Sequence, residues 1–224
     1  MASDVLTRAD LNRAILARQM LLAREKITVV RAVERLAGLQ AQLARPPFIG
    51  LWSRIAGFEA KDLARAVHDR KVVRATLLRG TLHLMTAEDY VALRPVLQPM
   101  LAAGMQGVLE DRAAGMDVER VLASARAALG GDKAMTFEDL RAVLSEAWPG
   151  IDERALGYAV RMHLPLVQVP MTRPGGGRAF PPSRSPTRGS VVRWGRARAP
   201  PPSSSAIWAH SVPRASRTRR PGRA

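Results

Sequence analysis

Two glutamines separated by a single residue, Gln40 and Gln42, are the side chains best suited to a specific chemistry. A carboxamide both donates and accepts hydrogen bonds but is not an effective base near neutral pH. The pair could therefore orient a water molecule or a polar substrate rather than abstract a proton. Gln40 follows Leu36 at helical spacing, which predicts that it lies on the apolar face of a helix. A buried amide needs hydrogen-bond partners, so capping or cross-linking of the helix end is an equally open interpretation.

The helical interpretation restricts how the two glutamines could act together. Residues at i and i+2 do not share a face of an α-helix. Both carboxamides would reach one site only if the helix loosens before Pro46, which biases the residue before it away from helical geometry.

Metal, cofactor and nucleophile patterns are not found in the sequence. The chain has no cysteine, and its histidines lack the spacing of metal ligands. Gly175–Gly177 is followed by no Lys-Ser/Thr pair, so it does not match a phosphate-binding loop. We therefore expect neither a metal ion nor a cofactor. The four histidines are His68, His83, His163 and His210.

The charge of the chain is unevenly distributed. The net charge is +16, but residues 171–224 hold 12 arginines with no lysine and no acid. The preceding part keeps 23 basic against 19 acidic residues, a net charge of +4. The pI of 11.6 therefore reflects the tail and does not by itself indicate nucleic-acid binding. The N-terminus lacks a signal peptide and no apolar run approaches about 20 residues, so a cytoplasmic protein is expected.

Residues 171–224 are rich in Arg, Pro, Ser and Gly, a composition that cannot bury enough apolar area to fold. One interpretation is a disordered basic arm that attracts phosphates. The other is translation out of frame, because Arg outnumbers Lys 31 to 4, as in GC-rich coding DNA. Back-translating Ser205–Arg223 with chosen synonymous codons and reading from the third base gives RYLGPFGPASVADAQAWS, a helix-compatible segment. The frameshift would lie between Pro170 and Gly177.

The organised part predicts a mainly α fold with short β-hairpins, arranged as tandem winged-helix units. The first unit covers residues 5–112, the second begins at 117–170, and 171–224 is the disordered tail. Three Thr-x-x-Asp pairs, beginning at Thr7, Thr86 and Thr136, each predict a helix start. Alternating apolar residues over Val72–Met85 predict a hairpin. Prolines at 95 and 99 are expected to break or kink the helix that follows.

Individual elements follow from hydrophobic spacing. The expected helices are residues 10–23 with Leu11, Ile15 and Leu22 on the apolar side, 28–42, 47–55, 60–69 with Leu63 and Val67 inward, 86–110, 118–129, 136–147 and 152–162. A strand is expected over 164–169, and its hairpin partner is expected to be missing because the tail begins there.

Two segments carry a resemblance to a known family. Gln40-Ala41-Gln42, within LAGLQAQ, resembles the Gln-hydrophobic-Gln motif of AlkZ/YcaQ-type winged-helix DNA glycosylases. The segment LRGTLHL over residues 78–84 is similar to a second recurring segment of that family. The resemblance covers residues 6–170, and the out-of-frame peptide resembles the family's later winged-helix region. The family's C-terminal β-rich domain has no counterpart in the sequence as printed.

The resemblance implies cleavage of the N-glycosidic bond of alkylated or cross-linked bases in double-stranded DNA. An N7-alkylated purine already carries positive charge and leaves without a strong general acid. Gln40 and Gln42 would then position the water and the sugar, with no metal or cofactor. Arg79 and His83 are candidates for DNA contacts from the hairpin. The alternatives are that Arg79 is a solvated turn residue and that His83 is a residue with its hydrogen bonds satisfied. Arg154 and Arg161, seven apart on the candidate recognition helix, could face phosphate, although an ordinary solvated face is the favoured interpretation.

Two other functions are open on the sequence. A non-catalytic winged-helix DNA-binding protein or regulator would bind a preferred duplex and ignore lesions. An inactive truncated product would expose core, unfold easily and aggregate. The sequence indicates neither the oligomeric state nor the lesion specificity.

The frameshift hypothesis makes a direct prediction about the coding DNA. Sequencing from the Leu164 codon past the stop codon, on independent template, should show a base gained or lost between the Pro170 and Gly177 codons. An intact frame through this stretch contradicts the hypothesis and makes the arginine-rich tail genuine.

Overall fold

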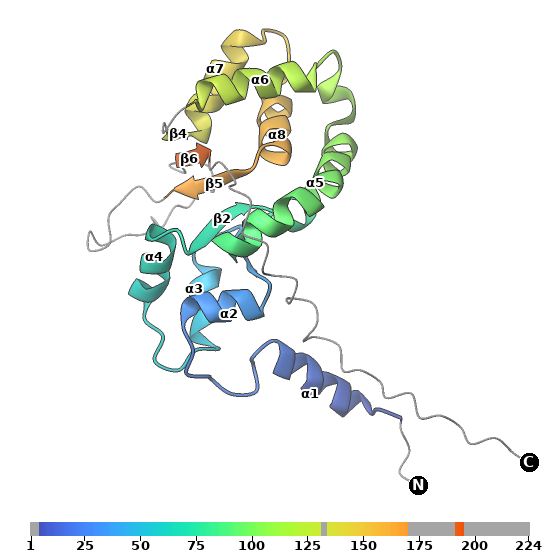
Figure 1. Ribbon diagram of the computed structural model, residues 1–224. Coiled ribbons are helices and arrows are strands. Elements are labelled where there is room, and N and C mark those ends of the chain that lie inside the picture. The colour runs from blue at the N-terminus through green and yellow to red at the C-terminus, as the bar shows by residue number, and fades with distance from the viewer. Residues whose placement is uncertain (1–4, 131–133, 170–190, 195–224) are drawn as a thin grey trace, which may run out of the picture.

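A computed structural model describes residues 5–130, 134–169 and 191–194 of the chain (Figure 1). Over these residues the fold is mainly helical, with a single six-stranded sheet through the middle of the molecule. The helix α1 (Arg8–Arg18) stands apart from the rest at one end, and the long helix α5 (Ala87–Leu109) links the two halves of the sheet. No helix in the described part is both long and apolar enough to cross a membrane.

The same order of elements occurs twice: helix, strand, helix, helix, strand, strand. We call residues 29–86 the first half and residues 118–194 the second half. The first half consists of α2 (Val29–Arg35), β1 (Leu39–Gln40), α3 (Pro46–Trp52), α4 (Ala60–His68), β2 (Val72–Thr76) and β3 (Leu82–Thr86). The second half consists of α6 (Val118–Ala128), β4 (Ala134–Thr136), α7 (Phe137–Ala147), α8 (Glu153–His163), β5 (Leu166–Val169) and β6 (Val191–Trp194).

The sheet repeats the same strand arrangement in mirror order. Its order is β1-β3-β2-β5-β6-β4, so each half places its last strand between its other two. All the strand pairs are antiparallel. The halves join where Arg74 pairs with Gln168 and Ala75 with Val167. An antiparallel pair between equivalent strands is what a local two-fold relation between the halves produces.

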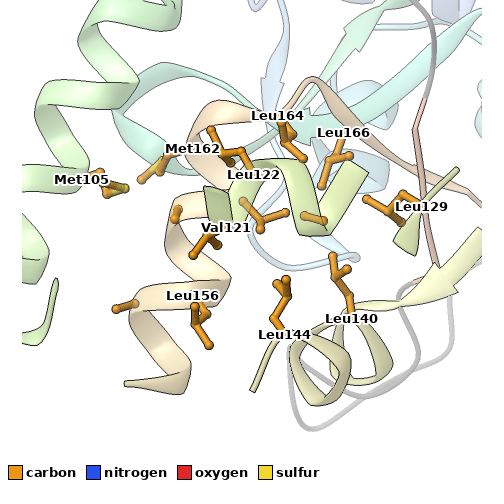
Figure 2. Close-up of a cluster of buried hydrophobic side chains, with 14 of the residues drawn as sticks. Met105, Val121, Leu122, Leu129, Leu140, Leu144, Leu156, Met162, Leu164 and Leu166 are labelled. Atoms are coloured by element: carbon orange, nitrogen blue, oxygen red, sulfur yellow. The ribbon is translucent and has the colours of Figure 1, made fainter. Parts of the chain in front are cut away.

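Three apolar clusters hold this arrangement together. In the second half, side chains from α5, α6, α7, α8 and β5 converge on one core, and Leu122, Leu140, Leu144 and Leu156 are almost fully buried in it (Figure 2). In the first half, α2, α3 and α4 pack on the sheet face that carries Leu84. The opposite face is covered by the start of α5, through Tyr90 and its neighbours.

The predicted helix starts and the hairpin are confirmed. Thr7 and Asp10 form a reciprocal capping box, and the hydroxyls of Thr86 and Thr136 accept from the backbone amides of Asp89 and Asp139. Hydrogen bonding to Thr7 lowers the pKa of Asp10. The strands β2 and β3 pair in register from Val72–Thr86 to Thr76–Leu82.

The predicted helix over residues 28–42 is wrong, because α2 ends at Arg35. Ala37 and Gly38 both have positive φ, 52° and 104°, and the Gly38 amide donates to Val33 O at 2.9 Å. This is the hydrogen bond of a Schellman motif, in which an α-helix ends with a residue in the left-handed region. A Cβ at Gly38 would lie 2.8 Å from Leu84 O, so the chain can turn here only with glycine.

Two further helix predictions are corrected. The helix expected over residues 10–23 ends at Arg18 and has no buried residue; Leu11, Ile15 and Leu22 are exposed. Pro95 and Pro99 do not break α5, which continues to Leu109, while the alternative of a kink stays a prediction. Tertiary packing outweighs the lost amide donors, because apolar residues before Pro95 pack into the cluster around Tyr90 and apolar residues after Pro99 pack into the core of the second half.

The strand β6 corrects the expectation that β5 has no hairpin partner. Residues 191–194 lie within the segment predicted to be disordered, yet they pair with both β5 and β4. Residues 170–190 and 195–224 lie outside the described residues, so the prediction of disorder for them stays a prediction, as does the frameshift.

Tyr90 gives the fold a measurable pH dependence. Burial raises the pKa of Tyr90 to about 12, and its hydroxyl lies 3.4 Å from Leu166 O. A raised pKa stabilises the fold fully below the unfolded-state value near 10, and this contribution is lost as the pH rises toward 12. We expect chemical denaturation at a series of pH values to show a steeper alkaline loss of stability in the wild type than in Tyr90→Phe. Parallel curves for the two proteins between pH 10 and 12 would contradict this linkage.

Candidate active site

The glutamine pair, Gln40 and Gln42, lies at the edge of the sheet. Gln40 ends β1, Ala41 follows it outside regular structure, and Gln42 begins a bend. Ala41 is only 1% exposed, whereas both glutamines are exposed. This exposed–buried–exposed pattern places both glutamine side chains on the solvent side while Ala41 points inward. The structure thereby removes the geometric difficulty of the helical interpretation, and it contradicts the expectation that Gln40 lies on an apolar helix face.

Pairing of β1 with β3 fixes the backbone position of Gln40 and of Ala41. Leu39 pairs with Leu84 and Gln40 with His83, and the Ala41 amide donates to Leu82 O at 2.7 Å. Directly opposed side chains of antiparallel strands lie on the same face with their Cβ atoms about 5 Å apart. The Gln40 side chain therefore stands next to the His83 position at the sheet edge.

The regular ladder ends at Ala41, and side chains take over its next hydrogen bonds. The Leu82 amide donates to the side-chain oxygen Oε1 of Gln42 at 3.0 Å. The Ala41 carbonyl, which faces Leu82 in this register, instead accepts from Arg74 Nε at 2.8 Å. The Gln42 carbonyl accepts from Arg74 Nη2 at 3.2 Å. Arg74 thus holds the two carbonyl groups that follow Gln40.

These contacts make the two carboxamides unequal. The oxygen of the Gln42 side chain is occupied by the Leu82 amide, which leaves its NH2 group as the free part. Within the described residues no hydrogen bond engages the Gln40 side chain. Gln40 can therefore both accept and donate, while Gln42 presents a fixed donor.

Arg74 is a cation that the sequence analysis missed. It lies in β2 between buried neighbours, and its Nη1 donates to Gln168 Oε1 of β5 at 2.5 Å. Burial lowers the pKa of Arg74, although a guanidinium stays protonated at neutral pH. The sequence did offer one signal, an arginine inside an otherwise apolar strand. It could not show the partners of that arginine, which lie 32 to 94 residues away.

The hairpin candidates occupy different environments. Arg79 is exposed in the turn between the strands and has a left-handed φ of 54°. His83 is 7% exposed, and its Nδ1 lies 3.0 Å from Thr81 O. A side chain in place of Gly80 would collide with Met162 of α8, so the turn is packed against the second half. The structure places His83 within the sheet, not on its surface.

The two candidate arginines on α8, Arg154 and Arg161, also lie in different environments. Arg154 is exposed in the first turn. Arg161 stacks on Tyr158, 4.5 Å from the ring centroid, and lies 5.8 Å from the Phe137 ring. The structure brings neither arginine to the glutamine pair through a hydrogen bond or ion pair among the described residues. Within the same residues there is no group of three or more His, Cys, Asp or Glu side chains that could hold a metal ion.

Comparison with known proteins places this chain among proteins similar to DNA glycosylases. The sequence model of a protein family described as DNA glycosylase AlkZ-like matches residues 33–223, more than four fifths of the chain. The chain therefore belongs to the AlkZ-like DNA glycosylase family. The match begins later and extends further than residues 6–170, over which the sequence resemblance was recognised.

One solved structure supports the same fold. The DNA glycosylase AlkZ of Streptomyces sahachiroi aligns with a TM-score of 0.57 at 18% sequence identity. The alignment covers 79% of this chain and 46% of that one, so the chain spans about half the length of its structural relative. A search of curated proteins finds no match.

The hydrogen bond to Gln42 predicts a difference between the two glutamines. Gln42→Ala removes the acceptor of the Leu82 amide. The nearby Ala41 carbonyl is a poor replacement, because it already accepts from Arg74. A net hydrogen bond of about 1 kcal/mol corresponds to about fivefold faster amide exchange. Hydrogen exchange of the Leu82 amide followed by NMR should show this acceleration in Gln42→Ala but not in Gln40→Ala. Equal protection in both variants would mean that the Gln42 side chain does not hold Leu82.

Proposed function

We propose that this protein hydrolyses the N-glycosidic bond of alkylated bases in double-stranded DNA. The observation that carries the proposal is the placement of Gln40 and Gln42, which are both exposed while Ala41 between them is buried and the Leu82 amide holds the Gln42 side chain. Membership of the AlkZ-like family supplies the reaction class.

The proposed reaction needs no strong acid. In an N7-alkylated purine the base is already cationic, so the C1′–N9 bond breaks with its electron pair passing to the base. The sugar becomes oxocarbenium-like, and a water oxygen forms the new bond to C1′ while its proton passes to solvent. The purine leaves as a neutral alkylated base. The protein's task is to place the water and the sugar, which is catalysis by orientation.

The two glutamines divide this task according to their hydrogen bonds. Gln40, whose carboxamide is free to turn, accepts a hydrogen bond from the attacking water. This hydrogen bond directs a lone pair of the water oxygen at C1′. Gln42, whose oxygen is held by the Leu82 amide at 3.0 Å, offers its NH2 group to an oxygen of the sugar-phosphate backbone. A carboxamide whose oxygen is already held loses less rotational freedom when it meets substrate.

DNA binding would come from the two repeated halves. The order helix, strand, helix, helix, strand, strand, with the last strand central, is the arrangement of a winged-helix unit, and we assign one unit to each half. In such units the helix before the central hairpin enters the major groove, which corresponds to α4 and α8. The unit boundaries inferred from sequence, 5–112 and 117–170, then need extension of the second unit to Trp194.

The arginine and histidine candidates take different roles under this proposal. Arg79 and Arg154 are exposed and suited to phosphate contacts. His83 and Arg161 are held by Thr81 and by aromatic rings, so they support the hairpin and the α8 surface rather than reach DNA directly.

The test of the function is release of a base. A duplex with one N7-methylguanine should lose the base on incubation with the purified chain, measured by chromatography of the free base. Gln40→Ala and Gln42→Ala should each lower the single-turnover rate at least about a hundredfold, as expected when a positioning contact to the reacting groups is removed. Both variants should keep the circular dichroism spectrum of the wild type and melt cooperatively.

Gln106→Ala is the matched control, because Gln106 is an exposed glutamine on α5, away from the glutamine pair. Its rate should equal that of the wild type. Binding of duplex without release, regardless of the lesion, would support a non-catalytic DNA-binding protein instead. Absence of both binding and release, with a non-cooperative melt, would support an inactive fragment.

A further inference from the structure

The Arg74 side chain connects three segments that are far apart in the sequence. Its guanidinium donates to the carbonyls of Ala41 and Gln42 and to the side chain of Gln168. Gln168 is also the residue paired with Arg74 across the β2–β5 junction. One planar group with a fixed fork of donors therefore ties the glutamine pair of the first half to β5 of the second half.

The contact to Ala41 decides how β1 ends. In an antiparallel ladder the amide and carbonyl of Ala41 would both bond to Leu82. The amide does so, but the carbonyl accepts from Arg74, and the Leu82 amide turns to the Gln42 side chain. Without the arginine, the Ala41 carbonyl would be free to complete the ladder, and the Gln42 carboxamide would lose its only described partner.

We propose that Arg74 is a positioning residue for the reaction: it prevents the ladder from closing at Ala41 and so keeps the Gln42 carboxamide fixed beside Gln40. Through Gln168 it makes this geometry depend on the docking of the second half. Arg74 touches neither water nor DNA in this role. The catalytic consequence of this inference rests on the proposed function. The effect of Arg74 on which acceptor the Leu82 amide uses does not depend on that function.

The chain contains a matched control for this arginine. Arg94 of α5 is 4% exposed, donates to the carbonyls of Met162 and Leu164, and bonds to the side chain of Gln98. It therefore shares with Arg74 two backbone carbonyls and one glutamine oxygen as acceptors, has Tyr90 as an additional partner, and burial likewise lowers its pKa. It has no hydrogen bond to the glutamine pair. Arg94→Met reports the cost of losing a buried arginine without loss of the positioning contact.

The first experiment follows the Leu82 amide by hydrogen exchange. In Gln42→Ala this amide exchanges faster than in the wild type. Adding Arg74→Met to Gln42→Ala should restore its protection, because the Ala41 carbonyl becomes available. Adding Arg94→Met should not restore it. A double variant with Arg74→Met in which Leu82 exchanges as fast as in Gln42→Ala, or faster, would overturn the proposal, because a merely structural arginine can only lower protection.

The second experiment measures single-turnover release from the N7-methylguanine duplex at saturating enzyme. We expect Arg74→Met to slow release at least about tenfold, since a displacement of about 1 Å costs up to a hundredfold. The dissociation constant for the duplex should stay within about threefold, and Arg74→Lys should recover part of the rate, because an ammonium donates to fewer of the three acceptors. Arg94→Met should release the base at close to the wild-type rate once corrected for the folded fraction.

The two experiments separate the two levels of the argument. If the wild-type protein releases no base, the proposed function is wrong. The hydrogen-exchange experiment then still decides whether Arg74 controls the hydrogen bond of Gln42. Active wild type with equal rates for Arg74→Met and Arg94→Met overturns the positioning role while the function stands.

Discussion

The pairing of β2 with β5 is the contact on which the rest of this structure depends. It joins two three-stranded arrangements into one sheet and sets how the cores of the two halves lie relative to each other. Only two residue pairs make this junction, so side chains must reinforce it. Arg74 and Gln168 do so at the junction itself, while Arg94 binds the end of α8 from α5. These guanidinium groups, one half-buried and one buried, each make three hydrogen bonds and act where apolar packing alone would leave orientation unspecified.

The same junction bears on the candidate active site. Arg74 bonds to β5 on one side and to the carbonyls after Gln40 on the other. The first half could form its strands without this arginine, but its edge strand would then gain one more ladder hydrogen bond, from the Leu82 amide to the Ala41 carbonyl. Interruption of the ladder leaves a carboxamide presented to solvent with its oxygen held. A small defect in a regular sheet is how a fold of ordinary elements acquires a fixed polar group.

Charge contributes less to this picture than the composition implies. The net charge of +16 resides mostly in residues 171–224, and the preceding part is near +4. Binding of DNA by the described residues would therefore depend on where single arginines are placed, such as Arg79 in the turn and Arg154 at the start of α8. The long-range attraction expected of a highly basic protein belongs to the segment outside the described residues.

Local sequence determined the features that depend on neighbouring residues. The Thr-x-x-Asp caps, the inward face of α4 and the β2–β3 hairpin follow from spacing, because their hydrogen bonds and faces are set within a few residues. The Gln-Ala-Gln segment was recognisable for the same reason. Tertiary structure decided the rest: Gly38 must fit against Leu84 O, so helical periodicity through Gln40 gave way to a strand. The partners of Arg74 lie 32 to 94 residues away, and only the folded sheet brings them within hydrogen-bonding distance.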